Sequence, residues 1–114
     1  MSASATALTT SLQRVGSISV LKVDGEIDLV SSPRFGTALA EALSEHPAVL
    51  VVDMAGVGFC GSVGISALLG ESEPVPDTEL RIVASMPVRR LIEVAGMDEV
   101  LPLFDTLEAA CATS

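Results

Sequence analysis

Aromatic and basic residues are scarce in this sequence of 114 residues. Aromatic residues make up 3% of it, and neither Trp nor Tyr occurs. The hydrophobic core must therefore be built from aliphatic side chains, and 49% of all residues are hydrophobic. Lys and Arg together number 6 against 15 Asp and Glu, which gives a net charge of -9. This charge argues against nucleic acid and anionic membranes as partners.

Long apolar stretches are also lacking. The apolar runs, such as Val49–Val52, are far shorter than a membrane span. The first ten residues have neither the basic start nor the long apolar stretch of a signal peptide. We therefore expect a cytoplasmic protein that forms a single domain over residues 1–114, of which residues 1–8 are flexible.

Histidine and cysteine are too few to predict a metal site or an enzyme. Cys60 and Cys111 lack metal-ligand spacing, so neither a metal nor a cofactor is expected. A serine nucleophile at Ser62 would need a histidine base, but His46 lies at the opposite end of its βα unit. Cysteines in apolar stretches are usually core residues. A redox-sensitive pair of Cys60 and Cys111 stays open as an alternative, provided that the fold brings them within disulfide reach.

Helices and strands alternate after an N-terminal hairpin. Ser32 is expected to cap a helix with Pro33 at its first position, and Phe35, Leu39 and Leu43 form an apolar stripe along it at i, i+4 and i+8. Asp105 with Glu108 forms a capping-box pattern. This order predicts an α/β fold with right-handed crossovers and a largely parallel sheet. The expected strands cover 9–15, 17–24, 49–54, 80–84 and 100–104, the last at a sheet edge; the expected helices begin at 32, 63, 87 and 105, the second is brief (63–69), and 71–79 is a surface loop.

Two polar residues follow neighbouring strands of the expected sheet. Asp28 comes after the strand at 17–24, and Ser62 comes after the strand at 49–54 and opens a helix. Ligands of such sheets usually bind beyond the carboxyl ends of the strands. Ser62 could be a structural cap or a phosphate acceptor, because a helix start favours both. Asp28 could cap the next helix, or orient a hydroxyl and a metal-bound phosphate donor.

Glycines surround Ser62 at positions 56, 58, 61 and 64. A nucleophile elbow needs glycine where Cys60 stands, and a phosphate loop needs a Lys-Ser/Thr pair that is absent. A tight turn between strand and helix accounts for the glycines. A nucleotide-binding or small-molecule-binding domain remains an alternative, although no basic residue near the turn favours it.

Three stretches of the chain resemble the STAS-domain family of anti-sigma-factor antagonists. They are L-K-V-D-G-E-I-D at 21–28, V-V-D-M-A-G-V-G-F-C-G-S-V-G-I at 51–65, and V-R-R-L-I-E-V-A-G-M at 88–97. These resemble the family's strand ending in G-E-L/I-D, its D-S-S/T-G-L turn and its third helix. The resemblance spans about residues 9–112. It implies a small mixed, mostly parallel β-sheet of about four to five strands packed against about four helices.

The resemblance implies partner switching by a regulatory protein that is not an enzyme. In this family the unphosphorylated antagonist binds an anti-sigma factor that is also an ATP-dependent serine kinase, and a sigma factor is released. Phosphorylation then dissociates the complex, and a phosphatase is a further implied partner. The phosphorylated serine of the family corresponds to Ser62. The implied partner-binding residues are Asp28, Gly61, Ser62, Val63, Gly64 and Ile65.

Two positions beside Ser62 depart from the family pattern. Gly61 stands in place of an aspartate, and Val63 in place of a second hydroxyl residue. The charge and hydrogen-bonding groups that a kinase would meet are therefore altered. The alternative function is a STAS binding module without a phosphoswitch, which binds constitutively or responds to oxidation through Cys60 and Cys111.

Overall fold

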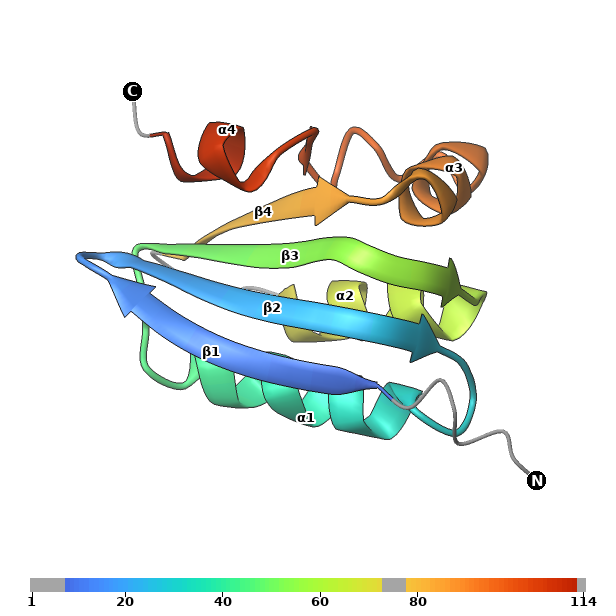
Figure 1. Cartoon of the computed structure of the whole chain (residues 1–114), viewed down its shortest axis with the longest axis horizontal. Coiled ribbons are helices and arrows are strands. Elements are labelled where there is room, and N and C mark those ends of the chain that lie inside the picture. The colour runs from blue at the N-terminus through green and yellow to red at the C-terminus, as the bar shows by residue number, and fades with distance from the viewer. Residues whose placement is uncertain (1–7, 73–77, 113–114) are drawn as a thin grey trace.

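The computed structural model describes residues 8–72 and 78–112, which form a five-stranded sheet and four helices (Figure 1). The strand order is β1-β2-β3-β4-β5, with β1 antiparallel to β2 and the other neighbours parallel. The predicted mixed, mostly parallel sheet is therefore confirmed. The strands are β1 (Thr9–Val15), β2 (Ile18–Ile27), β3 (Val49–Cys60), β4 (Glu79–Ala84) and β5 (Leu103–Phe104); the helices are α1 (Ser32–Leu43), α2 (Ser62–Ser72), α3 (Met86–Val94) and α4 (Leu107–Cys111).

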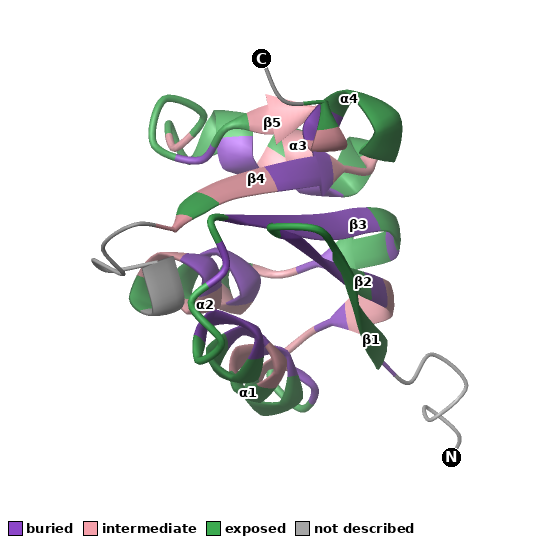
Figure 2. Ribbon diagram, turned by 90° about the vertical axis from the view of Figure 1, so that its left-hand side faces the viewer, coloured by how far each residue is buried: buried purple, intermediate pink, exposed green. Residues whose placement is uncertain are grey.

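The strand order explains where the helices lie. From β2 onward, each strand is followed along the chain by its neighbour in the sheet. When all of these connections are right-handed and run in the same direction, their helices lie on the same face of the sheet. Side chains of α1, α2 and α3 accordingly share one buried cluster with alternate residues of β2 and β3. The helix α4 instead contributes to a second, smaller cluster on the other face. Figure 2 shows α1 and α2 together on one side of the sheet.

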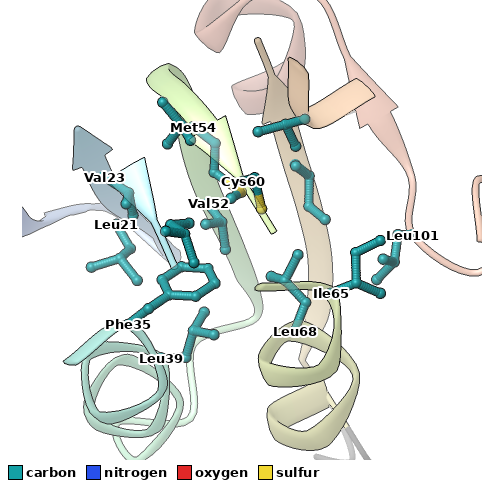
Figure 3. Close-up of a cluster of buried hydrophobic side chains, with 14 of the residues drawn as sticks. Leu21, Val23, Phe35, Leu39, Val52, Met54, Cys60, Ile65, Leu68 and Leu101 are labelled. Atoms are coloured by element: carbon teal, nitrogen blue, oxygen red, sulfur yellow. The ribbon is translucent and has the colours of Figure 1, made fainter. Parts of the chain in front are cut away.

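The main core is aliphatic around a single phenylalanine. Phe35 of α1 is completely buried and points toward the strands, as Figure 3 shows. With Leu39 and Leu43 it forms the buried stripe that the sequence predicted. The central strand β3 is mostly buried, whereas the edge strand β1 is exposed along its whole length (Figure 2). Both faces of β3 are thus covered, as expected of a central parallel strand.

The ordered core begins earlier than predicted. Leu8 is only 3% exposed and belongs to the main core, and the Arg34 guanidinium donates a hydrogen bond to its carbonyl oxygen at 3.4 Å. The expected flexible segment therefore does not include Leu8. The remainder of that prediction, residues 1–7, lies outside the described residues.

Strands β2 and β3 both extend beyond their expected ends at residues 24 and 54. β2 continues to Ile27 because two register shifts against β3 accommodate Gly25, whose φ of 112° suits glycine. β3 continues to Cys60, and at Gly56 a Cβ would overlap the Asp24 carboxylate. Gly25 and Gly56 therefore let β2 and β3 stay paired at positions where a larger residue would be strained or would clash.

Helix boundaries differ by a few residues from the prediction. Ser31, not Ser32, occupies the N-cap position of α1, so that Pro33 is its second residue. The helix α2 passes through Gly70 to Ser72 and is longer than the brief helix expected. Part of the loop expected at 71–79, residues 73–77, lies outside the described residues.

The C-terminal part of the chain has a different cap from the one predicted. The Thr106 hydroxyl accepts a hydrogen bond from the Ala109 amide at 3.0 Å, so Thr106 caps α4. Asp105 instead pairs with the Arg89 guanidinium at 2.7 Å. The expected strand at 100–104 shortens to β5 at the sheet edge, because Pro102 has no amide donor for the ladder.

Candidate functional site

A hydrogen-bonded turn follows β2 and fixes Asp28. One carboxylate oxygen, Oδ1, accepts hydrogen bonds from the Val30 and Ser31 amides, both at 2.9 Å. The Ser31 hydroxyl in turn accepts from the Asp28 amide at 3.0 Å and donates to the Glu26 carbonyl at 2.8 Å. Asp28 therefore caps the turn that leads into α1, and the buried Ser31 holds the turn against the end of β2.

The turn also sets the charge state of Asp28. Hydrogen bonds to its ionised form, chiefly from the Ser31 amide, lower the pKa of the Asp28 carboxyl below its ordinary value. Because its pKa is lowered in the folded state, ionised Asp28 stabilises the fold at pH values above the ordinary carboxyl pKa. This stabilisation is lost as the pH falls through the pKa that Asp28 has in the folded protein.

We expect Asp28→Asn to be less stable than wild type at neutral pH, and this gap to narrow as the pH falls below the ordinary carboxyl pKa. Asparagine keeps an acceptor oxygen but lacks the charge, so only the wild type loses stability on acidification at this position. Urea unfolding of both proteins at about pH 7 and about pH 3 measures the difference. An equal gap at both pH values would contradict the assignment of this charge to Asp28.

Ser62 opens α2 without acting as a structural cap. The chain enters the helix through Gly61, whose amide donates to the Ile27 carbonyl at 2.9 Å and so ties the start of α2 to the end of β2. Ser62 is exposed, and its hydroxyl makes no hydrogen bond within the described parts of the chain. The sequence left two roles open for Ser62, a structural cap and a phosphate acceptor, and its hydroxyl does not serve as the cap.

The ends of β2 and β3 bring Asp28 and Ser62 to one shallow pocket, as their positions in the sequence predicted. The pocket has a volume of about 470 Å³ and is lined by Asp28, Leu29, Val30, Phe59, Gly61, Ser62 and Val63. Leu29, Val30 and Phe59 are 78%, 87% and 49% exposed. Large apolar side chains gathered on a surface mark a contact site for another molecule.

These three apolar residues were missed from the sequence. Hydrophobic side chains beside strand ends are usually buried, and nothing in the spacing of Leu29, Val30 and Phe59 marks them as exposed. The turn held by Asp28 directs Leu29 and Val30 outward, and Phe59 is exposed while Cys60 is buried. The signal available was their position beside Asp28 and Ser62, beyond the carboxyl ends of the strands.

Two of the expected partner-binding residues lie inside the molecule. Gly64 is buried, and Ile65 is part of the main core. A Cβ on Gly64 would lie 2.5 Å from the Cys60 sulfur and 3.1 Å from Ile27 Cγ2, so glycine allows α2 to pack closely here. The accessible members of the expected set are Asp28, Gly61, Ser62 and Val63.

The two cysteines are free and belong to different clusters. The Cys60 sulfur lies among the main-core side chains (Figure 3), whereas Cys111 packs against the second cluster on the opposite face. Burial raises the pKa of the Cys60 thiol to about 11. Because the thiolate is the reactive form, this cysteine is poorly suited to redox sensing. The structure therefore does not bring together the two cysteines that the redox alternative requires.

The chemistry of the pocket favours a protein partner over a nucleotide. Its described lining carries the Asp28 carboxylate and no Lys or Arg to meet a phosphate. Within 8–72 and 78–112, no group of three or more His, Cys, Asp or Glu could hold a metal ion. No helix in these ranges is long and apolar enough to cross a membrane.

Comparison with known protein families identifies the family of this fold. The family model described as the STAS domain matches residues 9–110. The chain belongs to the STAS domain family. Its match spans all five strands and most of α4, so the family covers nearly the whole described fold.

Members of the STAS family similar to this chain include anti-sigma-factor antagonists. RsfB of Mycobacterium tuberculosis, an anti-sigma-F factor antagonist, is 37% identical over 95 residues, which cover 82% of this chain and 78% of RsfB. An anti-sigma factor antagonist from Mycobacterium paratuberculosis has a crystal structure with a TM-score of 0.86 at 36% identity, and the match covers 91% of each chain. SpoIIAA in its unphosphorylated form shares the fold, with a TM-score of 0.68 at 20% identity over 89% of this chain and 92% of that one.

Proposed function

We propose that this protein is an anti-sigma-factor antagonist that binds an anti-sigma factor with serine kinase activity, frees a sigma factor, and is switched off by phosphorylation of Ser62. The observation that carries the proposal is the free, exposed hydroxyl of Ser62 in a pocket rimmed by exposed apolar side chains. The similarity to RsfB, itself an anti-sigma-F factor antagonist, supports the same conclusion.

The location of Ser62 suits a phosphate acceptor. The first amides of a helix lack carbonyl partners within it, and the helix dipole is positive there, so an added phosphate is tolerated in the free protein. In the transfer, the Ser62 oxygen bonds to the γ-phosphorus of ATP, ADP departs, and the hydroxyl proton passes to a base of the kinase.

The same phosphate would oppose binding. It adds about -1.5 to -2 charge at pH 7 next to the Asp28 carboxylate and the apolar rim. A partner that covers this pocket must then desolvate two neighbouring negative charges. Phosphorylation therefore leaves the folded protein stable and weakens its complex.

Intact-mass spectrometry after incubation with the kinase and ATP tests the acceptor. We expect one added phosphate on the wild type and none on Ser62→Ala. The matched control is Ser66→Ala, which removes another exposed serine of α2 and should leave phosphorylation unchanged. An unmodified wild type that still binds the anti-sigma factor would instead support a module that binds constitutively, and phosphate retained on Ser62→Ala would place the acceptor elsewhere.

A further inference from the structure

A second groove shares Phe59 with the Ser62 pocket. Its volume is about 320 Å³, and it is lined by Phe59, Cys60, Pro87, Arg90, Leu91 and Val94. Phe59 lines both depressions, so the two concave sites are neighbours. The groove is therefore continuous with the surface to which the proposed function assigns the partner.

One face of α3 forms the wall of this groove. The residues at 87, 90, 91 and 94 follow the spacing i, i+3, i+4, i+7, which places them on one side of a helix. Val88 and Ile92 point into the core from the adjoining face. Val94 is 81% exposed and Phe59 is 49% exposed, so the groove has an apolar rim that faces solvent.

The groove carries one positive charge that has no partner. Arg90 is exposed and makes no ion pair or hydrogen bond in the described ranges. Its neighbour Arg89, by contrast, pairs with Asp105 at 2.7 Å and with Glu93 at 3.7 Å. In a chain with 15 acidic residues and 6 basic ones, an unpaired guanidinium beside an apolar groove is available for a carboxylate from another molecule.

We propose that the groove between Phe59 and α3 is a second anchoring point for the anti-sigma factor, and that it takes a partner segment in which an apolar side chain stands beside a carboxylate. This proposal rests on the proposed function and adds the chemistry of the partner segment. The apolar side chain contacts Phe59 and Val94, and the carboxylate pairs with Arg90. A second copy of this chain is a poorer occupant, because two chains of net charge -9 repel each other.

Neutralising Arg90 tests the charged contact. We expect Arg90→Gln to weaken binding of the purified anti-sigma factor by about fivefold in titration calorimetry at low salt, and the difference from wild type to shrink as salt is added. The matched control is Lys22→Gln, which removes another unpaired cation from the opposite face of the sheet. This control should change the affinity by less than about twofold.

A second pair of variants tests the apolar contact. We expect Val94→Ser to weaken binding by about fivefold or more. The control is Val15→Ser, because Val15 is 63% exposed and lies in the hairpin at the opposite end of the sheet. Thermal unfolding of all four variants should match wild type, since each changed side chain is exposed.

The outcomes separate the two proposals. Equal affinities for Arg90→Gln and Lys22→Gln, with wild-type binding intact, would overturn the groove while leaving the proposed function in place. Failure of the wild type to bind any anti-sigma factor would overturn both. If Arg90→Gln and Val94→Ser instead dissociate a homodimer seen by sedimentation, the groove is an interface between copies and the proposal is wrong.

Discussion

Ser62→Asp is expected to weaken binding of the anti-sigma factor by more than about tenfold, while Ser62→Ala binds like the wild type. The new carboxylate would lie in the pocket that also contains Asp28, against the exposed side chains of Leu29 and Phe59. Burying a charge without a partner costs about 2 kcal/mol or more, and each 1.4 kcal/mol changes affinity about tenfold. Alanine removes a hydroxyl that makes no hydrogen bond in the described structure, so little is lost.

Titration calorimetry with the purified anti-sigma factor measures this difference. Ser66→Asp is the matched control, because it adds the same charge to an exposed serine of α2 that does not line the pocket. Its affinity should stay within about threefold of wild type. The folded state should tolerate Ser62→Asp, since a negative charge is favourable at a helix start. Equal affinities for Ser62→Asp and Ser66→Asp would contradict a switch at this position.

Gly64→Ala is expected to destabilise the protein by about 1–2 kcal/mol, although alanine is the better helix former. Alanine gains up to about 1 kcal/mol of helix propensity, but overpacking a core typically costs about 1–3 kcal/mol. The added Cβ would approach the Cys60 sulfur to 2.5 Å and Ile27 Cγ2 to 3.1 Å, and both side chains are confined in the core. The crowding therefore outweighs the propensity.

A double-mutant cycle identifies the cause. In a Cys60→Ala background the sulfur is absent, so Gly64→Ala should become close to neutral, which corresponds to a coupling of about 1–2 kcal/mol by urea unfolding. The control is Gly70→Ala in the same helix, where a Cβ would meet no atom within 4 Å. This change should stabilise the protein by about 0.5–1 kcal/mol. An equal cost of Gly64→Ala in both backgrounds would rule out the contact with Cys60.

The element order and the juxtaposition of Asp28 with Ser62 could be predicted from the sequence. The spacing of Phe35, Leu39 and Leu43 identified the buried face of α1. Alternating strands and helices imply a parallel sheet, and the carboxyl ends of its strands meet at one edge. No side-chain detail was needed to expect Asp28 and Ser62 in one pocket.

The buried face of α2 could not be predicted in the same way. Its sequence, S-V-G-I-S-A-L-L-G, has apolar residues on all sides, so periodicity does not show that Ile65 points inward and Val63 lines the pocket. The exposure of Phe59 could not be predicted either. The register shifts between β2 and β3 interrupt the regular alternation of buried and exposed side chains near the strand ends. Both depend on tertiary packing.

The turn around Asp28 has a consequence for the rate at which complexes break down. Four hydrogen bonds among Glu26, Asp28, Val30 and Ser31 hold the backbone that presents Leu29 and Val30. A partner that docks there meets a preorganised loop, so little conformational entropy is lost on association. Loosening the turn at Ser31 should therefore shorten the lifetime of a complex even though Ser31 itself is buried and out of the partner's reach.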